Sequence, residues 1–410
     1  MRVPFARFAI AVSLAAAFFA SPGHAEDQKV SKELAKPLVA AQKAMKDNDL
    51  ATALASVKEA DAMPNLTDFD KFTIQEFYAN IYIGQKDYAN AAVAYEKMAD
   101  SPALPAEKKK NVLTNAVLLD SNTNKIDNVK RYGTALEALG PLDSKVVGPL
   151  AVAYYNSGDT AKAQQLAQQE LARAQAAGEP PQQGILDIVA RTQLKSNDMA
   201  ASSKTLETLV TNYGDPNDWA QLIDIAFGTK GIHDIEALHL YRLRVLTNAK
   251  TSVEDYATMA AVADQLNYPV EEVTFLEHGL STNAITASDK AGAKLGAARP
   301  KAAKDKATIG EFEGIAKARK TGDYDLKLAE TYYGYNRYAD AADAAMRAMS
   351  KGGLKDPSEA NMVLGEALAA QGKNAEAVDA LSKANAGAWP AIAHLWTVYT
   401  QRKYTTATTR

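Results

Sequence analysis

The chain has 410 residues, 46 basic and 49 acidic side chains, a net charge of −3 and no cysteine. The missing cysteines exclude disulfides and thiolate metal sites, so an apolar core has to hold the fold together. The mild acidity argues against a general binder of nucleic acid or of anionic membranes. We interpret the two basic clusters, at residues 108–110 and 294–306, as solvated helix faces.

Residues 1–25 have the pattern of a signal peptide. Arg2 and Arg7 precede a 13-residue apolar run from Phe8 to Ala20. The small residues Ser21, Gly23 and Ala25 follow this run. The run is shorter than the roughly 20 residues that a membrane-spanning helix needs. We therefore expect cleavage after Ala25, a secreted protein in a bacterial periplasm, no membrane span in the mature chain, and a short leader at 26–33. Cleavage would leave a net charge of −5, because only Arg2 and Arg7 are charged in this segment.

The rest of the sequence predicts helices joined by short turns. Alanine, leucine, lysine and glutamate dominate, and apolar residues recur three and four apart, as in Leu206, Leu209 and Val210. Turn signals that combine a left-handed residue with a capping side chain recur along the chain. They are Asp47-Asn48-Asp49, Gln85-Lys86-Asp87, Ser157-Gly158-Asp159, Ser196-Asn197-Asp198 and Gln371-Gly372-Lys373-Asn374. Helices with such short connections lie antiparallel.

A motif repeats along these helix pairs. Its clearest copies are Tyr78-Ala79, Tyr82, Asp87-Tyr88, Ala91, Tyr95; Leu150-Ala151, Tyr154, Gly158-Asp159, Ala163; and Leu364-Gly365, Leu368, Gly372, Ala377, Leu381. Small residues at such positions allow two helices to cross closely. In the second helices we place this position at Ala53, Ala91, Asn128, Ala163, Ser202, Ala237, Glu272, Ala341 and Ala377. One interval is nearly twice the others, which indicates a hidden degenerate unit.

The motif resembles the tetratricopeptide repeat (TPR) family. The resemblance covers residues 34–388 and implies an all-α fold: a right-handed superhelical solenoid of about ten antiparallel helix pairs. We expect the degenerate unit at about 287–320, with Pro300 in its turn. An amphipathic helix at 389–403 is expected to cap the last unit, although it could also bind a partner, and the tail at 404–410 is expected to be disordered.

The search for catalytic and metal-binding motifs finds no site. His233 and His239 are six residues apart and form no His-Glu-x-x-His motif, and no phosphate loop or Gly-x-Ser-x-Gly elbow is present. We therefore predict a protein that is not an enzyme and has no cofactor or metal. A pair of carboxylates that meets only in space stays open at this point.

The resemblance implies a concave groove lined by the first helix of each pair. Carried onto this chain, the inward positions are Asn80, Ile83, Val152, Tyr155, Asn156, Arg191, Lys195, Asp224, Phe227, Glu330 and Tyr333. Exposed aromatic and polar groups of this kind suit a peptide or a helix. The predicted function is a scaffold that binds a protein or peptide partner in the cell envelope. The alternative is binding or processing of envelope polysaccharide or peptidoglycan, and the oligomeric state is unknown.

Overall fold

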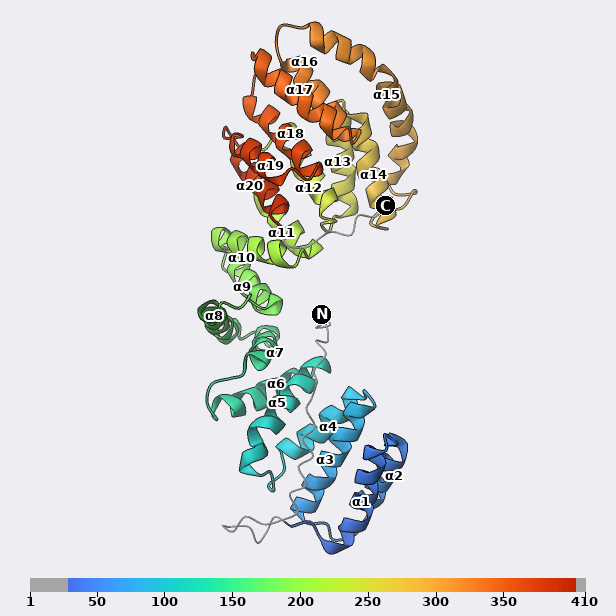
Figure 1. Ribbon diagram of the computed structural model, residues 1–410, viewed down its shortest axis with the longest axis vertical. Helices are drawn as coiled ribbons and strands as arrows, with labels where there is room; N and C mark the ends of the chain where they lie inside the picture. The colour runs from blue at the N-terminus through green and yellow to red at the C-terminus, as the bar shows by residue number, and fades with distance from the viewer. Residues whose placement is uncertain (1–28, 403–410) are drawn as a thin grey trace. The chain divides into compact units, whose positions relative to one another are not determined.

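The computed structural model describes residues 29–402. The predicted signal peptide, residues 26–28 of the leader and the tail at 404–410 lie outside the described residues. The chain divides into two compact units, an N-terminal unit that ends at Thr192 and a C-terminal unit that begins at Gln193 (Figure 1). Each unit is described by itself below.

The N-terminal unit consists of antiparallel helix pairs. The helices are α1 (Lys32–Lys46), α2 (Leu50–Asp61), α3 (Asp68–Gly84), α4 (Tyr88–Ala99), α5 (Ala106–Asn122), α6 (Ile126–Glu137), α7 (Ser144–Asn156) and α8 (Thr160–Ala177). Helix α9 (Gln183–Lys195) spans the boundary between the units. In the four pairs from α1 to α8, the first helix packs on the second, and α2, α4 and α6 each pack on the next pair.

The C-terminal unit contains further pairs and two additional helices. Its helices are α10 (Met199–Asn212), α11 (Pro216–Phe227), α12 (Asp234–Leu246), α13 (Val253–Gln265), α14 (Pro269–Ser281), α15 (Leu295–Ala318), α16 (Asp323–Gly334), α17 (Tyr338–Lys351), α18 (Pro357–Ala370), α19 (Asn374–Ser382) and α20 (Trp389–Thr400), with a 3-10 turn η1 (Gly292–Lys294) before α15. No strand occurs between residues 29 and 402. The prediction of an all-α fold built from consecutive helix pairs is confirmed.

The predicted turns have the expected geometry. Asn48, Lys86, Gly158, Asn197 and Gly372 all have positive φ, which lets the first helix end in a tight reversal. The next residue caps the second helix in four of these turns. Its carboxylate accepts a backbone N–H three residues later, as at Asp49 from Thr52 and at Asp87 from Asn90. Lys373 has no such bond.

These caps fix the register of the repeat and correct one position. The small residue of the second helix lies four residues after the cap, as at Ala53, Ala91, Ala163, Ala341 and Ala377, all of which are fully buried. In α6 the cap is Lys125, so the equivalent residue is Val129, which is buried, and not Asn128, which is half-buried. The prediction for Asn128 was wrong by one residue.

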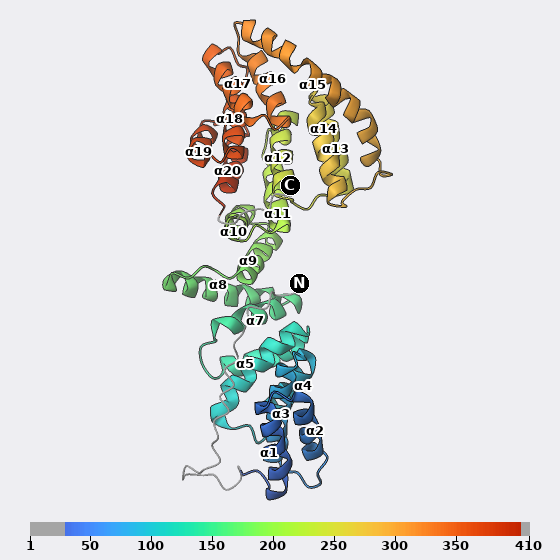
Figure 2. The ribbon, with the colours of Figure 1, turned by 45° about the vertical axis from the view of Figure 1, so that its right-hand side comes forward.

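The degenerate unit is one long helix and not a pair. Helix α15 runs through Pro300, which therefore lies inside a helix and not in a turn as predicted. The helix packs against α14 and α16 along the outer side of the C-terminal unit (Figures 1 and 2). Because α15 has no partner of its own, it shifts the alternation of first and second helices by one.

Helix α20 does more than cap the last pair. It packs on α18 and α19, as predicted, and also on α10, α11 and α12 near the start of the same unit. Ile392, Leu395 and Trp396 are buried, and the Trp396 indole N–H donates to the carbonyl oxygen of His239 in α12 at 3.1 Å. The C-terminal unit is therefore a ring of helices closed by α20.

Candidate functional site

The first helices of the N-terminal unit share an accessible face. Helix α1 lies against α3, and α5 lies against α7. Lys108 of α5 reaches α3, where its ammonium group lies 2.6 Å from the Glu76 carboxylate and over the Phe72 ring. Equivalent positions in these helices therefore line one side of the unit.

The register set by the caps identifies the positions on this face. The residues seven and four before each cap are Gln42 and Met45, Asn80 and Ile83, Leu118 and Ser121, and Val152 and Tyr155. All eight are partly or fully accessible, and Val152 is the most open, with 39% of its surface exposed. None carries a charge. We call these eight residues the inner strip.

In α16 and α18 of the C-terminal unit, the first of these register positions is buried. Seven residues before their caps, α16 has Glu330 and α18 has Glu366, and both are fully buried. His239 and Arg242 of α12 and Glu271 of α14 lie with them. Helices α12 and α14 are the second helices of their pairs, whereas α16 and α18 are first helices. The single helix α15 explains this change, because it stands between the two sets.

The five side chains form a closed ion-pair network, which we call the buried cluster. The Arg242 guanidinium lies 2.7 Å from carboxylate oxygens of both Glu271 and Glu330, and 3.0 Å from Glu366. His239 Nδ1 lies 2.6 Å from Glu366, and its Nε2 lies 3.4 Å from Glu330. The rings of Tyr333 and Trp389 pack against Arg242 and His239, respectively. Two cationic side chains, Arg242 and His239, thus pair with three carboxylates that are buried.

The electrostatics of the cluster favour its charged form. The carboxylates of Glu366 and Glu330 outweigh the desolvation of the imidazole and raise the pKa of His239 to about 10. Arg242 and His239 outweigh desolvation at Glu330 and lower its pKa to about 2. Burial raises the pKa of Glu271 despite its contact with Arg242.

The structure changes the interpretation of two predicted groove residues. Glu330 and Tyr333 are buried in the cluster, so the expectation that they line an open groove is wrong. The neighbouring Tyr335 is half-buried and donates from its hydroxyl to Asp305 at 2.9 Å. Tyr333 and Glu330 thus serve the closure of the ring.

The other predicted residues remain accessible to different degrees. Asn80, Ile83, Val152 and Tyr155 belong to the inner strip, and Asn156 is exposed one residue beyond Tyr155. Arg191 and Lys195 are exposed on α9. In the C-terminal unit, Asp224 is exposed and pairs with Arg244, while the half-buried Phe227 packs on Tyr241. The part of these residues in partner binding stays a prediction.

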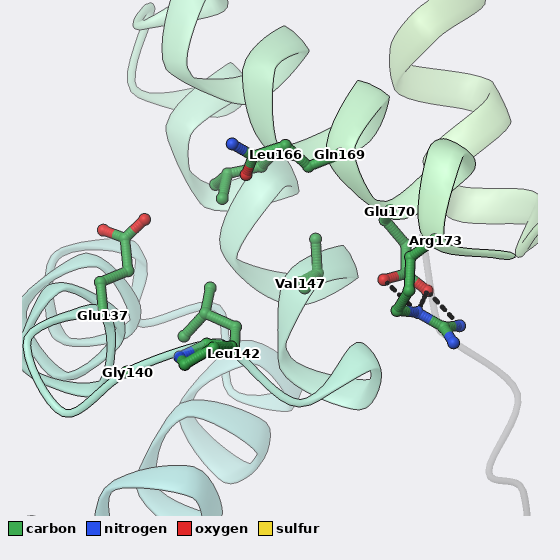
Figure 3. Close-up of a pocket in the computed structure, with 9 residues that line it drawn as sticks. Glu137, Gly140, Leu142, Val147, Leu166, Gln169, Glu170 and Arg173 are labelled. Atoms are coloured by element: carbon green, nitrogen blue, oxygen red, sulfur yellow. Dashed lines mark hydrogen bonds and ion pairs between the residues drawn. The ribbon is translucent and has the colours of Figure 1, made fainter. Parts of the chain in front are cut away.

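Two surface cavities lie on the other side of the helix pairs. One, of about 390 Å³, opens between α6 and α8 above α7 (Figure 3). Leu142, Val147 and Leu166 supply its apolar wall, and Glu170 sits in it, bonded to Arg173. The other, of about 690 Å³, lies between α17 and α19 above α18. Both are therefore grooves between consecutive second helices.

Neither metal ligation nor membrane insertion has a candidate in the described part of the chain. Among residues 29–402, no group of three or more histidine or acidic side chains is arranged to hold a metal ion, and the carboxylates of the buried cluster already pair with Arg242 and His239. No helix in the same range combines the length and apolarity needed to cross a bilayer.

Comparison with known proteins gives structural neighbours only. No protein-family model matches the chain, and no curated protein matches it in sequence. A tetratricopeptide repeat protein from Parabacteroides merdae superposes with a TM-score of 0.36 at 12% identity, over 66% of this chain and 100% of its own. Naa15/Naa10 bound to HypK-THB gives 0.37 at 14%, over 88% and 60%. The TPR domain of P58(IPK) gives 0.26 at 13%, over 90% and 97%.

The helix register decides the fold. A buried small residue recurs at one fixed position in seven of the nine second helices that belong to pairs. The two exceptions are Val129 in α6 and Glu272 in α14, and both are buried. The fold is a TPR-like helical repeat.

Sequence reasoning on the TPR-like pattern missed most of the buried cluster. His239, Arg242, Glu271 and Glu366 were not among the predicted site residues. One signal was present, namely charged residues at the inward register of α16 and α18 where the N-terminal helices have neutral ones. Their cationic partners in α12 could not be found, because the ring closure brings together residues more than 80 positions apart.

Proposed function

We propose that this TPR-like protein is a secreted, non-enzymatic scaffold that binds a peptide or protein partner in the cell envelope through the inner strip of its N-terminal unit. The carrying observation is the strip itself: eight accessible, uncharged positions in register on four neighbouring helices. A mixture of apolar side chains with amide and hydroxyl groups suits a protein segment. It offers no cation for an anionic polymer. Asn156, which is exposed beside Tyr155, is a candidate for its polar edge.

Secretion is supported by the basic, apolar and small-residue order of residues 1–25. The intact mass of the protein released from the envelope of expressing cells would report it: loss of residues 1–25 is expected. Full-length protein retained in the cytoplasm would contradict secretion without bearing on the strip.

Photo-crosslinking tests the strip directly. A benzophenone amino acid replaces Val152 in one variant and Val93 of α4 in another, because both valines are 39% exposed and only Val152 belongs to the strip. We expect crosslinks from position 152 to a defined envelope protein and none of that product from position 93. Tyr155→Glu, introduced into the variant that carries the crosslinker at position 152, should lower its recovery about tenfold, since a charge would enter a desolvated contact. Equal products at both positions, or a carbohydrate adduct alone, would overturn the proposal.

The polysaccharide alternative finds less support in the groove between α6 and α8. Its two carboxylates, Glu137 and Glu170, each lie 2.8 Å from a cation, Lys162 and Arg173 respectively. The hydrogen bonds from Arg173 and Ser144 outweigh burial and lower the pKa of Glu170. A general acid requires a raised pKa, so this pair is poorly suited to glycoside hydrolysis.

A further inference from the structure

The groove between α17 and α19 is an apolar channel on the surface of the C-terminal unit. Its volume is about 690 Å³, and α18 forms its floor with Leu364 and Leu368. Ala342 and Ala380 line it from the two walls, and Met346 and Met349 extend the wall of α17. The inner strip lies on the other unit, so this groove is independent of the function proposed above.

Unequal helix lengths leave the groove open at one end. Helix α17 continues for 14 residues, whereas α19 ends after nine, at Ser382. Met346 stands nine residues after the Arg337 cap, which is the position at which α19 stops in the next pair. Its side chain is consequently 49% exposed. Flexible methionines on an exposed apolar surface are typical of sites that accept another apolar side chain.

The charges at the groove are predominantly acidic. Asp343 of α17 and Glu376 of α19 lie on opposite walls, and neither forms an ion pair with another described residue. Asp379 is neutralised by Lys383 at 2.6 Å, which leaves Lys373 as the remaining cation of the lining. A segment that carries basic residues on both flanks of an apolar stripe therefore complements the groove.

The side-chain amides of the groove already donate to main-chain carbonyls. Asn361 donates to the Pro357 carbonyl, and Gln371 donates to the carbonyls of Tyr338 and Ala367. An extended peptide would bury main-chain N–H and C=O groups against apolar walls without partners. A helix satisfies its own main chain, and it can pack in the channel between two helices.

We propose that the groove between α17 and α19 binds an amphipathic α-helix of another protein, with an apolar stripe on Leu364, Leu368 and Met346 and basic residues facing Asp343 and Glu376. The partner helix would extend the layer of second helices by one element. This surface gives the scaffold a second binding site in addition to the inner strip.

The test uses the full chain and two designed fluorescent peptides of about 15 residues, which share a leucine stripe. One has lysine on both flanks and the other has glutamate. Fluorescence anisotropy should show saturable binding of the lysine peptide, and at least tenfold weaker binding of the glutamate peptide. Met346→Gln should weaken the lysine peptide about tenfold. The matched control is Met199→Gln on α10, where the side chain is 43% exposed, and its binding should not change.

Charge reversal makes the proposal falsifiable even if the absolute affinity is modest. The double variant Asp343→Lys/Glu376→Lys should prefer the glutamate peptide. No saturable binding of the lysine peptide, an equal loss in Met199→Gln, or an unchanged preference in the double variant would overturn the proposal. Two further outcomes would assign a different occupant to the groove between α17 and α19. A change in sedimentation with Met346→Gln would indicate a second copy of this chain, and tighter peptide binding after removal of residues 403–410 would indicate its own tail.

Discussion

The two units use the same register position in opposite ways. Seven residues before the cap, the N-terminal unit presents Asn80, Leu118 and Val152 at an accessible surface. The C-terminal unit places Glu330 and Glu366 there and buries both completely. The repeat therefore determines the direction in which a side chain points. Whether a side chain at that position reaches solvent depends on which other helices of the unit pack over it.

Two elements account for the difference. Helix α15 is unpaired and shifts the alternation of first and second helices by one. The second helices α12 and α14 therefore face inward before it, and the first helices α16 and α18 face inward after it. Helix α20 then packs back on α10, α11 and α12 and closes the ring. Carboxylates enclosed in this way need cations, and Arg242 and His239 supply them. The comparison predicts that the buried cluster supports the C-terminal unit, while the N-terminal unit has no ion pair to lose at the equivalent, uncharged positions.

The largest effect is expected from Arg242→Gln, which removes the central cation of the buried cluster. It leaves Glu271, Glu330 and Glu366 buried without their guanidinium, and we expect the free energy of unfolding of the C-terminal unit to fall by about 3–5 kcal/mol. Urea unfolding followed by tryptophan fluorescence measures this unit selectively, because the three tryptophans, Trp219, Trp389 and Trp396, all lie in it and are buried.

The matched control for this prediction is Arg131→Gln in the N-terminal unit. Arg131 pairs with Asp100 at 3.0 Å on the surface, and about half of each side chain is exposed. We therefore expect Arg131→Gln to lower the free energy of unfolding of the N-terminal unit by about 1 kcal/mol or less. Urea unfolding followed by circular dichroism measures this change. Adding Glu330→Gln to Arg242→Gln should recover part of the lost stability. An Arg242→Gln variant as stable as the wild type would show that the network does not support the unit.

A pH titration sharpens the comparison through His239. The pKa of His239 is raised to about 10 in the fold from an ordinary value of 6.5, so its contribution is complete below pH 6.5 and is lost as pH rises through 10. The facing groups are Glu366, Glu330, Arg242 and, in the same network, Glu271. Tyr333 stays neutral over this range, because burial raises its pKa well above 10. Between pH 7 and 10 this contribution should fall by about 2–4 kcal/mol, since a tenfold change in proton affinity is about 1.4 kcal/mol. Lys327, whose pKa burial lowers to about 8, acts with the opposite sign in the same range, so the contribution of His239 is the difference between the wild type and His239→Gln.

His239→Gln should remove most of this pH dependence while lowering stability at pH 7. His394→Gln is the control, because His394 is half-exposed and pairs with Glu207 at the surface. The measurement is the urea midpoint from tryptophan fluorescence at each pH. A difference between the wild-type and His239→Gln midpoints that does not change from pH 7 to 10 would mean that His239 is neutral in the folded protein. At the acidic end, Glu330 acts with the opposite sign: its contribution is lost as pH falls from about 4.5 towards 2.

The sequence predicts the local architecture well, because its signals are local. A left-handed residue followed by a capping aspartate marks a turn wherever it occurs, and the structure has these turns at Asn48, Lys86, Gly158 and Asn197. The buried small residues at Ala91 and Ala341 likewise follow from helix crossing alone. Register errors arise where a signal is weak, as in α6, whose Lys125 cap has no side-chain bond.

The sequence does not predict closure. The interval that hid a degenerate unit has the length of a helix pair, yet it holds one helix that continues through Pro300. The pattern of α20 indicates one apolar face, but it does not show that this face also contacts α10, α11 and α12. Glu330 and Tyr333 were therefore assigned to a groove on valid repeat logic, and the non-local contacts of the ring bury them.

The smallest change in stability is expected at Gly310, and it tests whether α15 is packed as tightly as the paired helices. Gly310 of α15 has open space where a Cβ would stand, so Gly310→Ala should stabilise the C-terminal unit by about 0.5–1 kcal/mol through helix propensity. Gly365 of α18 is the matched position in a paired helix. A Cβ there would lie 2.6 Å from Leu381 Cγ, so Gly365→Ala should destabilise by about 1–3 kcal/mol through overpacking. Tryptophan-detected urea unfolding measures both. Opposite signs distinguish a helix that lies on the outside of the ring from one that belongs to its packed pairs, and a loss of stability in Gly310→Ala would show that α15 is covered on its outer face.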